Sequence, residues 1–574
     1  MAAGLESTVI VYREQRIRAD PRDTLLALCR RVERLPHAPD HGTIVGLLVD
    51  IGVLEAGVAD ALAPEFDEDG PVTGALRRAS LAAGHALVAS WHGRAERLGH
   101  WRVELGRRLG ACACLPLPTY VDNRVPEGFA QYGLYPECYL EAAERLAREL
   151  RPTAAICLGI RSIGTALSAV VTAALEEAGC MVRSSTVRPR GHPFDRRPVL
   201  GSSLQADLAA SPDALFLVVD EGPGISGSSL AGTADMLAFL GISEERIILV
   251  PSWDPPPTSL RSETARQRWL RHRRYVSSFE QTWVEPGRMD DLLGPAPVDL
   301  SAGRWREALI PQAARRPAIH PQHERRKFRT PGTLLRFAGL GSVGDRRLSR
   351  ARTLAELGFS PHPLRLAHGF LALELVPGTP LVRGEVDLDL LDRMARYLAC
   401  LRDRFALAER ERTDLDEMLH VNLAEAGLEA WADNLHDPAD GPPVAVDGRM
   451  LPHEWVRTAR GHLKADALDH HDDHFFPGPV DIAWDLAAAV IEFGMAAEAR
   501  RVLVERYRRL SGDRTIGGRL PYYTVAYLAA RIGYCALAAE TLHGWPEGTR
   551  FRLMLEEYRA PLTDGSASLP RAYV

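Results

Sequence analysis

The chain has 574 residues, of which 46% are hydrophobic and 25% charged, and its formal net charge is −6. This composition is ordinary for folded globular domains and excludes a collagenous, fibrous or wholly disordered chain. The negative charge argues against nucleic acid or an anionic membrane surface as a bulk partner. We find no run of about 18 apolar residues and no basic-then-apolar leader at the N-terminus, so we expect a cytoplasmic protein without a membrane span.

Cysteine and lysine usage add two observations. The eight cysteines are scattered, and only Cys112 and Cys114 lie close together, so we expect reduced thiols rather than disulfides or a zinc site. Only two of the 69 basic residues are lysines, Lys327 and Lys464, and the other 67 are arginines. We attribute this scarcity to coding bias. The presence of a lysine despite such a bias suggests a role that arginine cannot fill.

Residues 1–114 are predicted to be a helical N-terminal region. The stretches 43–62 and 74–91 are rich in Ala and Leu, and their apolar residues recur at helical spacing. They carry no chemical motif. We therefore expect a helical cap or an oligomerisation module through which the chain would self-associate.

Residues 115–260 are predicted to form a doubly wound parallel sheet. Short apolar runs alternate with helical patterns, in the order 154–159, 164–178, 214–220, 228–240 and 246–251. Continuous apolar runs, rather than alternating apolar and polar residues, are typical of parallel strands that helices cover on both faces.

The strongest chemical signal is the run LVVDEGPGISGSSL at 217–230. A buried strand ends there in two acids, Asp220 and Glu221, and a Gly/Ser loop leads into a helix that starts near Ser228. Backbone N–H groups in such a loop and at a helix start bind anions. The adjacent carboxylates can hold ribose hydroxyls or help to bind Mg²⁺. A sugar phosphate fits both halves of this pattern.

This run resembles the ribose-phosphate-binding motif of type I phosphoribosyltransferases. The resemblance implies that Asp220 and Glu221 face the ribose hydroxyls and bind Mg²⁺, and that the substrate is PRPP or a nucleotide-like molecule. It also implies a cradle for the 5′-phosphate, made of Gly224, Ser226, Gly227, Ser228 and Ser229. The loop is one residue longer than the usual family pattern.

Two neighbouring segments agree with this resemblance. The strand at 154–159 runs into a loop with Arg161, Ser162 and Gly164, where the family binds pyrophosphate through backbone amides and often a basic side chain. A basic loop follows the next strand and is expected to close over the pyrophosphate, or else to be a solvated loop; its members are Arg188, Arg190, His192, Arg196 and Arg197. A generic doubly wound domain is the alternative for the whole region.

Residues 261–325 are expected to be a Pro- and Arg-rich connector with some helix. An RNA-binding patch over the basic stretch 304–329 is the alternative, although few aromatic residues interleave with its arginines.

Residues 326–574 resemble the aminoglycoside-phosphotransferase-like kinases, which have the α+β protein-kinase-like fold. FLALELVPGTPL at 370–381 matches the hinge strand and turn of that family, and VDIAWDLA at 480–487 matches its motif ending in Asp-Leu-Ala. In the strand 333–337, Arg336 stands where the family has its phosphate-binding lysine. The resemblance implies Mg²⁺ and ATP as cofactors of this domain.

The catalytic segment departs from the family pattern. Its best match, at 447–454, has Arg449 in place of the catalytic Asp and Glu454 in place of the metal-binding Asn. An arginine cannot orient a hydroxyl nucleophile as a base does. The segment KADALDHHDDH at 464–474 is dense in ligands. It is expected either to be a solvated loop or to hold Mg²⁺ and a phosphate through Lys464, Asp466 and Asp469.

Two further features have both a functional and a structural interpretation. Lys327 lies in the expected hairpin, where it would either touch a nucleotide phosphate or be structural. GLGSVG at 339–344 is a G-x-G-x-x-G run between a strand and a helix, but no acid ends the next strand, 360–366. A phosphate-contacting or structural turn is therefore favoured over a dinucleotide site.

The sequence thus predicts a multidomain α/β plus α+β protein, in which a doubly wound parallel sheet precedes a kinase-like domain. The favoured function is Mg²⁺-dependent phosphoribosyltransferase-like chemistry on PRPP or a phosphoribosylated small molecule. Two alternatives stay open: a non-catalytic regulator that senses nucleotides, and a phosphotransferase whose only active centre is the C-terminal domain.

Overall fold

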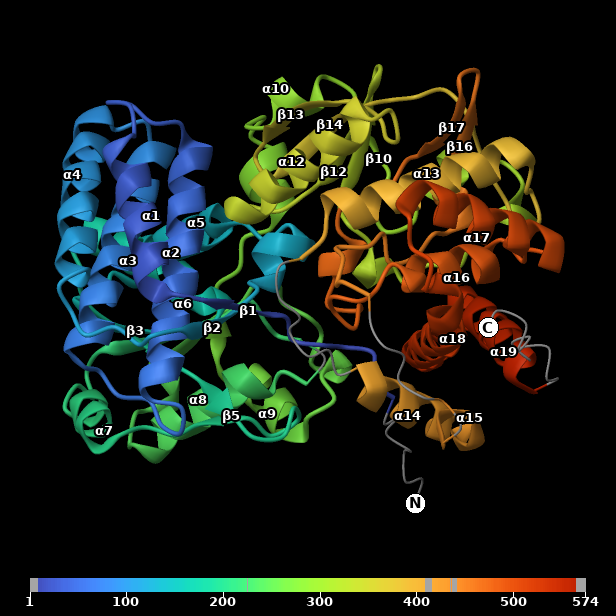
Figure 1. Cartoon of the computed structure of the whole chain (residues 1–574). Coiled ribbons are helices and arrows are strands. Elements are labelled where there is room, and N and C mark those ends of the chain that lie inside the picture. Colours follow the sequence, from blue (N-terminus) through green and yellow to red (C-terminus); the bar gives the residue numbers. More distant parts are fainter. Residues whose placement is uncertain (1–8, 225, 408–414, 434, 436–440, 564–574) are drawn as a thin grey trace.

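The structure is a computed structural model that describes residues 9–224, 226–407, 415–433, 435 and 441–563 (Figure 1). In Figure 1 a group of N-terminal helices stands on one side of the molecule, and the C-terminal half, coloured yellow to red, occupies the other side. The green segments of the middle of the chain lie between and below them.

The N-terminal region consists of four helices, α1 Pro21–Glu33, α2 His41–Leu62, α3 Pro71–Trp91 and α4 Ala95–Cys112. Aspartates cap the first two: Asp20 accepts from the Arg22 N–H and Asp40 from the Thr43 N–H. Among the described residues, α2 alone is long and apolar enough to cross a membrane, yet 78% of its most apolar window is buried inside the protein. A helix that is apolar on all sides packs as a core helix when neighbours surround it.

A five-stranded parallel sheet with the order β4-β3-β7-β8-β9 forms the centre of the first half. Its strands are β3 Ala154–Ile160, β4 Met181–Val187, β7 Leu215–Val219, β8 Ile247–Val250 and β9 Arg273–Arg274. Cys157 packs into one core with the helices on one face, and its neighbour Leu158 packs into a second core on the other face. Both faces are therefore buried, which explains the continuous apolar runs in the sequence.

Helices from the chain between the strands provide this cover. One face packs against α5 Pro136–Leu150 and α6 Ile163–Glu177, and the other against α7 Ser202–Ala209, α8 Ser228–Phe239 and α9 Glu263–Arg271. Two short antiparallel pairs flank the sheet: β1 Arg16–Ala19 with β2 Val121–Arg124, and β5 Pro189–Arg190 with β6 Arg197–Pro198.

The stretch expected to be a connector is more integrated than a solvated linker. Strand β9 extends the parallel sheet beyond residue 260. Trp283 is buried in the core on one face of this sheet, and Trp269 is buried in the core on the other face. The other short elements of the stretch are the π-helical turn η4 Glu280–Val284, α10 Asp290–Leu293, β10 Val298–Asp299 and α11 Trp305–Leu309. Large buried aromatics, rather than local helix or strand periodicity, hold this stretch in place.

The C-terminal half has two antiparallel sheets and a helical part. The first sheet has the order β10-β11-β12-β14-β13, with β11 Lys327–Thr330, β12 Thr333–Phe337, β13 Pro363–Ala367 and β14 Phe370–Glu374. The second pairs β15 Thr379–Pro380, β16 Trp455–Thr458 and β17 Gly461–Lys464. The helices are α12 Ser342–Glu356, α13 Leu388–Arg404, α14 Leu415–Glu425, α15 Glu429–Asp433, α16 Ala483–Glu492, α17 Ala497–Ser511, α18 Ile516–Thr541 and α19 Pro546–Thr563.

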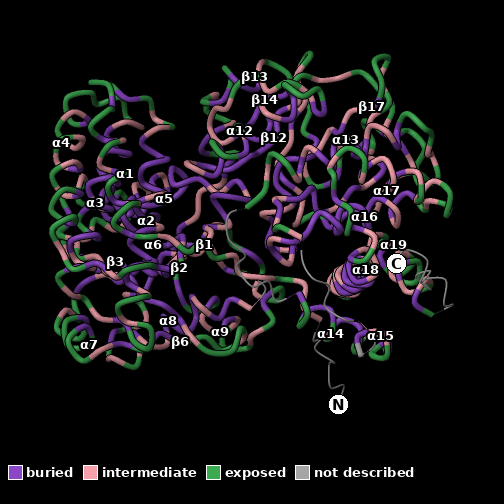
Figure 2. The backbone as a smooth tube through the Cα atoms, viewed as in Figure 1, coloured by how far each residue is buried: buried purple, intermediate pink, exposed green. Residues whose placement is uncertain are grey.

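One hydrophobic core joins the two halves of the chain. Phe337 of β12 and Phe370 of β14 belong to the same buried cluster as residues of α2, α3 and α6. Tyr135 packs between the two halves: its ring centroid lies 6.0 Å from that of Phe337 and 5.3 Å from that of Trp283. A separate core fills the helical part around α13, α16 and α18, and Figure 2 shows both as stretches of buried backbone.

The G-x-G-x-x-G run of residues 339–344 is a turn at the contact between the halves. Gly341 precedes α12 with a φ of +59°, and a Cβ on Gly46 of α2 would lie 3.2 Å from its Cα. A Cβ on Gly344 would lie 2.4 Å from the Gly339 carbonyl oxygen. Close backbone approach explains these glycines, so the structure supports the structural interpretation of the run.

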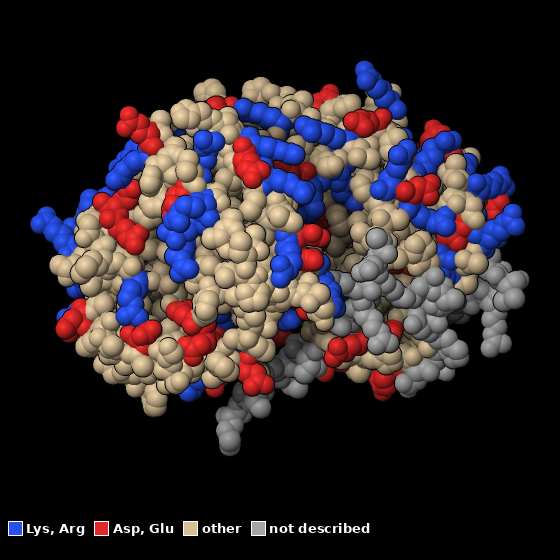
Figure 3. Space-filling view, turned by 60° about the vertical axis from the view of Figure 1, so that its left-hand side comes forward, with Lys and Arg blue, Asp and Glu red and all other residues tan. Residues whose placement is uncertain are grey.

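Basic and acidic side chains are interspersed on the face of the molecule that Figure 3 shows. Many charged side chains of the described residues form ion pairs, such as Arg107 with Glu104 and Arg97 with Glu177. A face with this mixture offers a polyanion little net attraction, in line with the overall charge of −6.

Candidate functional site

A cavity of about 690 Å³ opens at the carboxyl edge of the parallel sheet, and we call it the carboxyl-edge cavity. Strands β3, β4 and β7 all end there, because parallel strands share one carboxyl edge. Eight of the residues selected from the sequence line it: Arg161, Ser162, Arg188, Arg190, Arg196, Asp220, Glu221 and Ser229. Seven others from the same three loops are outside its lining: Gly164, His192, Arg197, Gly224, Ser226, Gly227 and Ser228.

Asp220 and Glu221 form the acidic wall of this cavity. The Tyr139 hydroxyl donates to the Asp220 carbonyl over 2.6 Å, and Asp220 Oδ1 accepts from the Glu221 N–H over 2.8 Å. Burial raises the pKa of Asp220 to about 6. Burial, and then repulsion from Glu127, raises the pKa of Glu221 to about 8. A cation that needs both charged forms would therefore bind more tightly as the pH rises.

Glu127 is a third carboxylate of the cavity, and the sequence analysis missed it. It precedes the π-helical turn η1 (Gly128–Tyr132) and accepts a hydrogen bond from the Tyr12 hydroxyl. Burial raises its pKa to about 7. Gly128 brings the turn close to the acidic wall, since a Cβ there would lie 2.8 Å from Glu221 Cδ. This approach depends on the fold, and the local sequence carries no signal for it.

The guanidinium groups of the cavity are held by two acids that the sequence analysis also missed. Arg161 Nε lies 3.0 Å from Asp60 Oδ1, and its terminal nitrogen pairs with Asp67. Arg188 pairs with Asp60, and Arg190 lies 3.1 Å from Asp67 Oδ1. The expectation that the Arg161 side chain is available for pyrophosphate therefore needs revision, because this side chain is 3% exposed and lies between two carboxylates.

Backbone donors also converge on this edge of the sheet. Helices α6 and α8 both begin here, after Ser162 and Gly227. Neither of these two residues caps its helix with a side chain, although the Ser228 N–H donates to Ser226 Oγ over 3.3 Å. Ser162 has a φ of +109°, a costly conformation for a residue with a Cβ. Gly164 is required for close packing, since a Cβ there would lie 2.5 Å from the Val219 carbonyl oxygen. The N–H groups at two helix starts favour an anionic ligand.

The basic loop and the serine loop contact each other. The Ser228 hydroxyl donates to the Pro193 carbonyl over 2.7 Å, and Ser226 Oγ lies 3.1 Å from Ser228 Oγ. The hairpin β5–β6 packs on α8 at Gly232, where a Cβ would lie 2.0 Å from the Arg196 carbonyl oxygen. The basic segment is thus a hairpin fixed to α8, and it places Arg196 in the cavity lining.

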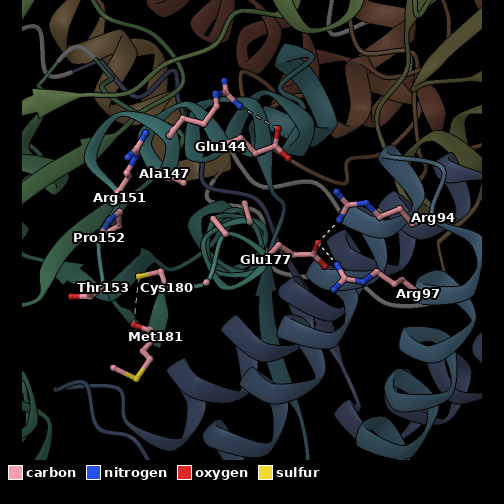
Figure 4. A pocket seen from close by; sticks show the side chains of 14 residues that line it. Arg94, Arg97, Glu144, Ala147, Arg151, Pro152, Thr153, Glu177, Cys180 and Met181 are labelled. Carbon is pink, nitrogen blue, oxygen red and sulfur yellow. Dashed lines mark hydrogen bonds and ion pairs between the residues drawn. The ribbon is translucent and has the colours of Figure 1, made fainter.

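A second, larger cavity of about 1320 Å³ lies near the start of β4, toward the other end of the sheet (Figure 4). Figure 4 shows Arg94 and Arg97 both pointing to Glu177. Its arginines are largely exposed, 44% and 56% for this pair, and it contains none of the residues selected from the sequence. Size alone therefore does not identify the site, and the smaller cavity has the convergent buried polar groups.

A buried group of charges, which we call the charged cluster, lies in the C-terminal half. Its members are Arg336, Asp447, Glu454, Lys464, Asp466, Asp469 and His470. Lys464 Nζ lies 2.5 Å from Glu454 Oε2, 3.1 Å from Asp447 Oδ2 and 2.5 Å from the Asp466 carbonyl. Burial would lower the pKa of Lys464, but the two carboxylates outweigh burial and raise it.

The structure brings Arg336, Lys464, Asp466 and Asp469 together, as expected, but in mutual ion pairs. Arg336 contacts both Asp466 and Asp469. Lys464 is fully buried, so the expected solvated loop at 464–474 is wrong for this residue. Lys327 lies apart, 3.2 Å from Glu324 and 5.7 Å from the Trp305 ring centre.

Side-chain hydrogen bonds hold the segment 447–454, in which the sequence has Arg449 instead of a base. Asp485 of α16 accepts from the Asp447 and Gly448 N–H groups over 2.6 and 2.8 Å, which fixes the backbone of this segment. Arg449, at the position of the catalytic Asp, has its guanidinium 3.4 Å from Asp473. An ion-paired guanidinium supplies no proton-accepting group.

The donor atoms of the charged cluster would suit a metal by type, but fixed cations already neutralise them. Two triads have ligand atoms within 4.8 Å of one another, Asp447–Glu454–His470 and Asp466–Asp469–His470. The Lys464 ammonium lies against the first triad and the Arg336 guanidinium against the second. The expected Mg²⁺ site at Asp466 and Asp469 therefore does not fit these residues, and no chemistry is derived from it.

Asp220 and Glu221 fit Mg²⁺ better. Mg²⁺ is usually held by one or two carboxylates together with phosphate oxygens and water. The acidic wall provides two such carboxylates in a cavity that also has arginines for phosphates.

No protein-family model and no curated protein matches the sequence. Solved structures match about half of the chain. One is a choline/ethanolamine kinase family protein from Mesorhizobium loti, at 17% identity and TM-score 0.32, covering 43% of this chain and 88% of that one. Another is a Plasmodium vivax ethanolamine kinase, at 11% identity and TM-score 0.32, covering 53% and 91%.

A third match is the macrolide 2′-phosphotransferase MphH from Brachybacterium faecium, at 19% identity and TM-score 0.29, covering 42% and 89%. About half of this chain is thus similar to kinase-like phosphotransferase structures. At such TM-scores the similarity carries no argument about activity, which has to come from the chain's own residues.

Proposed function

We propose that the carboxyl-edge cavity binds a phosphorylated ribose, PRPP or a nucleotide, together with Mg²⁺, and that the chain is a phosphoribosyltransferase-like enzyme. One observation carries the proposal. Three loops that follow β3, β4 and β7, selected separately from the sequence, line the same cavity. Their acids, arginines and helix starts match the two chemical parts of a ribose phosphate.

The division of labour follows from the side chains. Asp220, the more ionised acid, accepts hydrogen bonds from ribose hydroxyls. The helix start at Ser228 and the Ser229 hydroxyl take the 5′-phosphate. Arg190 and Arg196 face the diphosphate. Arg161 holds the loop in shape through Asp60 and Asp67 rather than contacting the leaving group.

In the transfer, the bond from ribose C1 to the diphosphate oxygen breaks and a bond from C1 to the acceptor forms. The diphosphate leaves with the bonding electrons, and the guanidinium groups stabilise the charge that develops on it. Mg²⁺ supplies further positive charge when it is bound with the diphosphate. The acceptor loses a proton, and Glu127, a cavity carboxylate whose pKa burial raises to about 7, receives it.

A nucleotide-sensing regulator is the second candidate. The observation that favours it is the Arg161 side chain, which is committed to Asp60 and Asp67 instead of being available for pyrophosphate. Such a regulator would bind the same ligands in the same cavity without turnover. Release of pyrophosphate from PRPP in the presence of an acceptor separates the two candidates.

The test is calorimetric titration of PRPP and Mg²⁺ into wild-type protein, Asp220→Asn and Asp213→Asn. Asp213 is the matched control because its side chain is 97% exposed and does not line the cavity. We expect saturable binding to wild type and control, and at least tenfold weaker binding to Asp220→Asn, about 1.4 kcal/mol. Absence of binding to folded wild-type protein would refute the proposal.

A further inference from the structure

The segment of residues 9–19, which we call the N-terminal strap, crosses from the C-terminal half to the carboxyl-edge cavity. At the start of the strap, the side chain of Asn422 in α14 makes two hydrogen bonds to the backbone of Ile10. Asn422 Oδ1 accepts from the Ile10 N–H over 2.7 Å, and Asn422 Nδ2 donates to the Ile10 carbonyl over 3.0 Å. At its end, β1 pairs with β2 beside the cavity. The strap thus contacts both halves of the chain.

Alternate residues of the strap face in opposite directions. Tyr12, Glu14 and Arg16 line the carboxyl-edge cavity. Between them, Arg13 donates from its backbone N–H to the His474 carbonyl over 2.8 Å, and Gln15 Nε2 donates to the Asp473 carbonyl over 2.8 Å. Successive side chains of an extended chain point to opposite faces. One face of the strap is therefore a cavity wall, and the other is its attachment to the C-terminal half.

Ion pairs within the C-terminal half fix Asp473, one of the residues whose carbonyl groups accept hydrogen bonds from the strap. Asp473 is 4% exposed, and its carboxylate lies 3.2 Å from Arg325 and 3.4 Å from Arg449. Arg325 in turn lies 3.2 Å from Asp469, a member of the charged cluster. These ion pairs thus fix the Asp473 side chain, and with it the neighbouring backbone carbonyl groups that hold the strap.

We propose that the C-terminal half positions the N-terminal strap as a wall of the carboxyl-edge cavity, with Arg13 and Gln15 as positioning residues and Tyr12 as the ligand-facing residue. This inference rests on the proposed function. It gives the C-terminal half a role in that site which requires neither a base nor a metal of its own. The wall presents a phenol, a carboxylate and a guanidinium, which suit a ligand group with both hydrogen-bond donors and acceptors.

The test uses full-length Gln15→Ala, Tyr12→Phe and the double variant, titrated with PRPP and Mg²⁺. Gln205→Ala is the matched control, since its side-chain amide also donates to a backbone carbonyl, that of Leu200, over 2.8 Å, but away from the strap. We expect Gln15→Ala and Tyr12→Phe each to weaken binding at least about threefold, and Gln205→Ala to bind as wild type. Both changes leave the core intact, and circular dichroism checks the fold.

The double variant distinguishes positioning from a general structural effect. If Gln15 acts through Tyr12, its replacement adds little once the Tyr12 hydroxyl is gone, so the double variant binds about as weakly as the weaker single variant. Additive losses, or wild-type binding by Gln15→Ala, would overturn the inference while leaving the proposed function intact. No binding by wild-type protein would overturn the proposed function and, with it, this inference.

Discussion

The two lysines of this chain offer a direct test of the idea that the charged cluster is structural. Lys464 is fully buried between Asp447 and Glu454, with its Nζ 3.1 and 2.5 Å from their oxygens. Lys327 is the internal control, because it pairs with Glu324 at 3.2 Å with 16% of its side chain exposed. We expect Lys464→Met to destabilise the protein far more than Lys327→Met.

The magnitude follows from what each substitution leaves behind. Methionine fills most of the lysine volume, so the cavity contribution is small. In Lys464→Met, however, two buried carboxylates lose their cation, and removing one partner of a buried pair costs about 3–5 kcal/mol. The Lys327 pair is only partly buried, with 16% and 19% of its side chains exposed, so water reaches the carboxylate left behind and the cost is about 1 kcal/mol. A gap of about 2–4 kcal/mol between the variants follows.

Differential scanning calorimetry at neutral pH measures this gap as a difference in the temperature of the first unfolding transition. Glu454→Gln in the Lys464→Met background should recover part of the loss, because it removes one of the stranded charges. The difference in unfolding temperature between Lys464→Met and wild type should also narrow as the pH falls below about 4. Burial alone would raise the pKa of Asp447, but Lys464 together with His470 and Tyr397 outweighs burial and lowers it. The stability that this ionised acid contributes is lost as it is protonated. Equal unfolding temperatures for the two lysine variants would refute the structural role of Lys464.

Three further predictions concern the carboxyl-edge cavity. Because burial raises the pKa of Glu221 to about 8, the folded state holds a proton that the unfolded state loses, so stability falls as pH rises from about 4.5 to 8. Glu221→Gln should therefore melt at least about 2 °C above wild type near pH 8, with a smaller difference near pH 5, and a pH-independent difference would contradict this. Asp67→Asn should destabilise the protein by about 3 kcal/mol in chemical denaturation, because the buried Asp67 neutralises Arg161 and Arg190. Asp213→Asn, at an exposed position, should leave the free energy of unfolding unchanged, and equal effects of the two substitutions would count against the ion pairs. Gly164→Ala should lower the melting temperature and weaken PRPP binding, because its Cβ would collide with the Val219 carbonyl oxygen. Gly110→Ala, in open space on α4, should be neutral or stabilising by up to about 1 kcal/mol. A lower melting temperature for both variants would refute the close-packing argument.

The sequence was informative where the fold depends on short-range patterns. An apolar run, two acids, a Gly/Ser loop and a helix start follow one another within 217–230, and the structure has β7, the acids and α8 in that order. The sheet is parallel, so the other two loops had to end at the same edge as this one. For that reason the residue pattern alone is enough to place Arg188 and Asp220 in one site.

The sequence was least informative where distant segments supply each other's partners. Asp60 lies in α2 and Asp67 in the loop after it. Both form ion pairs with Arg161, which is about 100 residues later in the chain. The ligand-rich segment 464–474 suggested a metal because its own residues are acids and histidines. Its counter-charges come from Arg336 and Arg325, more than 120 residues away in sequence, and no local pattern shows that pairing.

The contacts of α12 tie the two halves of the chain together. Arg347 donates to the Ala130 carbonyl over 2.6 Å and lies 2.8 Å from Asp472. One turn on, Arg350 donates to the carbonyl groups of Ala467 and Ala445, both over 2.8 Å. The helix is thus fixed at once to the turn beside the carboxyl-edge cavity and to the loops of the C-terminal half. A movement of α12 relative to these segments would strand the buried guanidinium groups of Arg347 and Arg350, so the interface favours a rigid support for the strap.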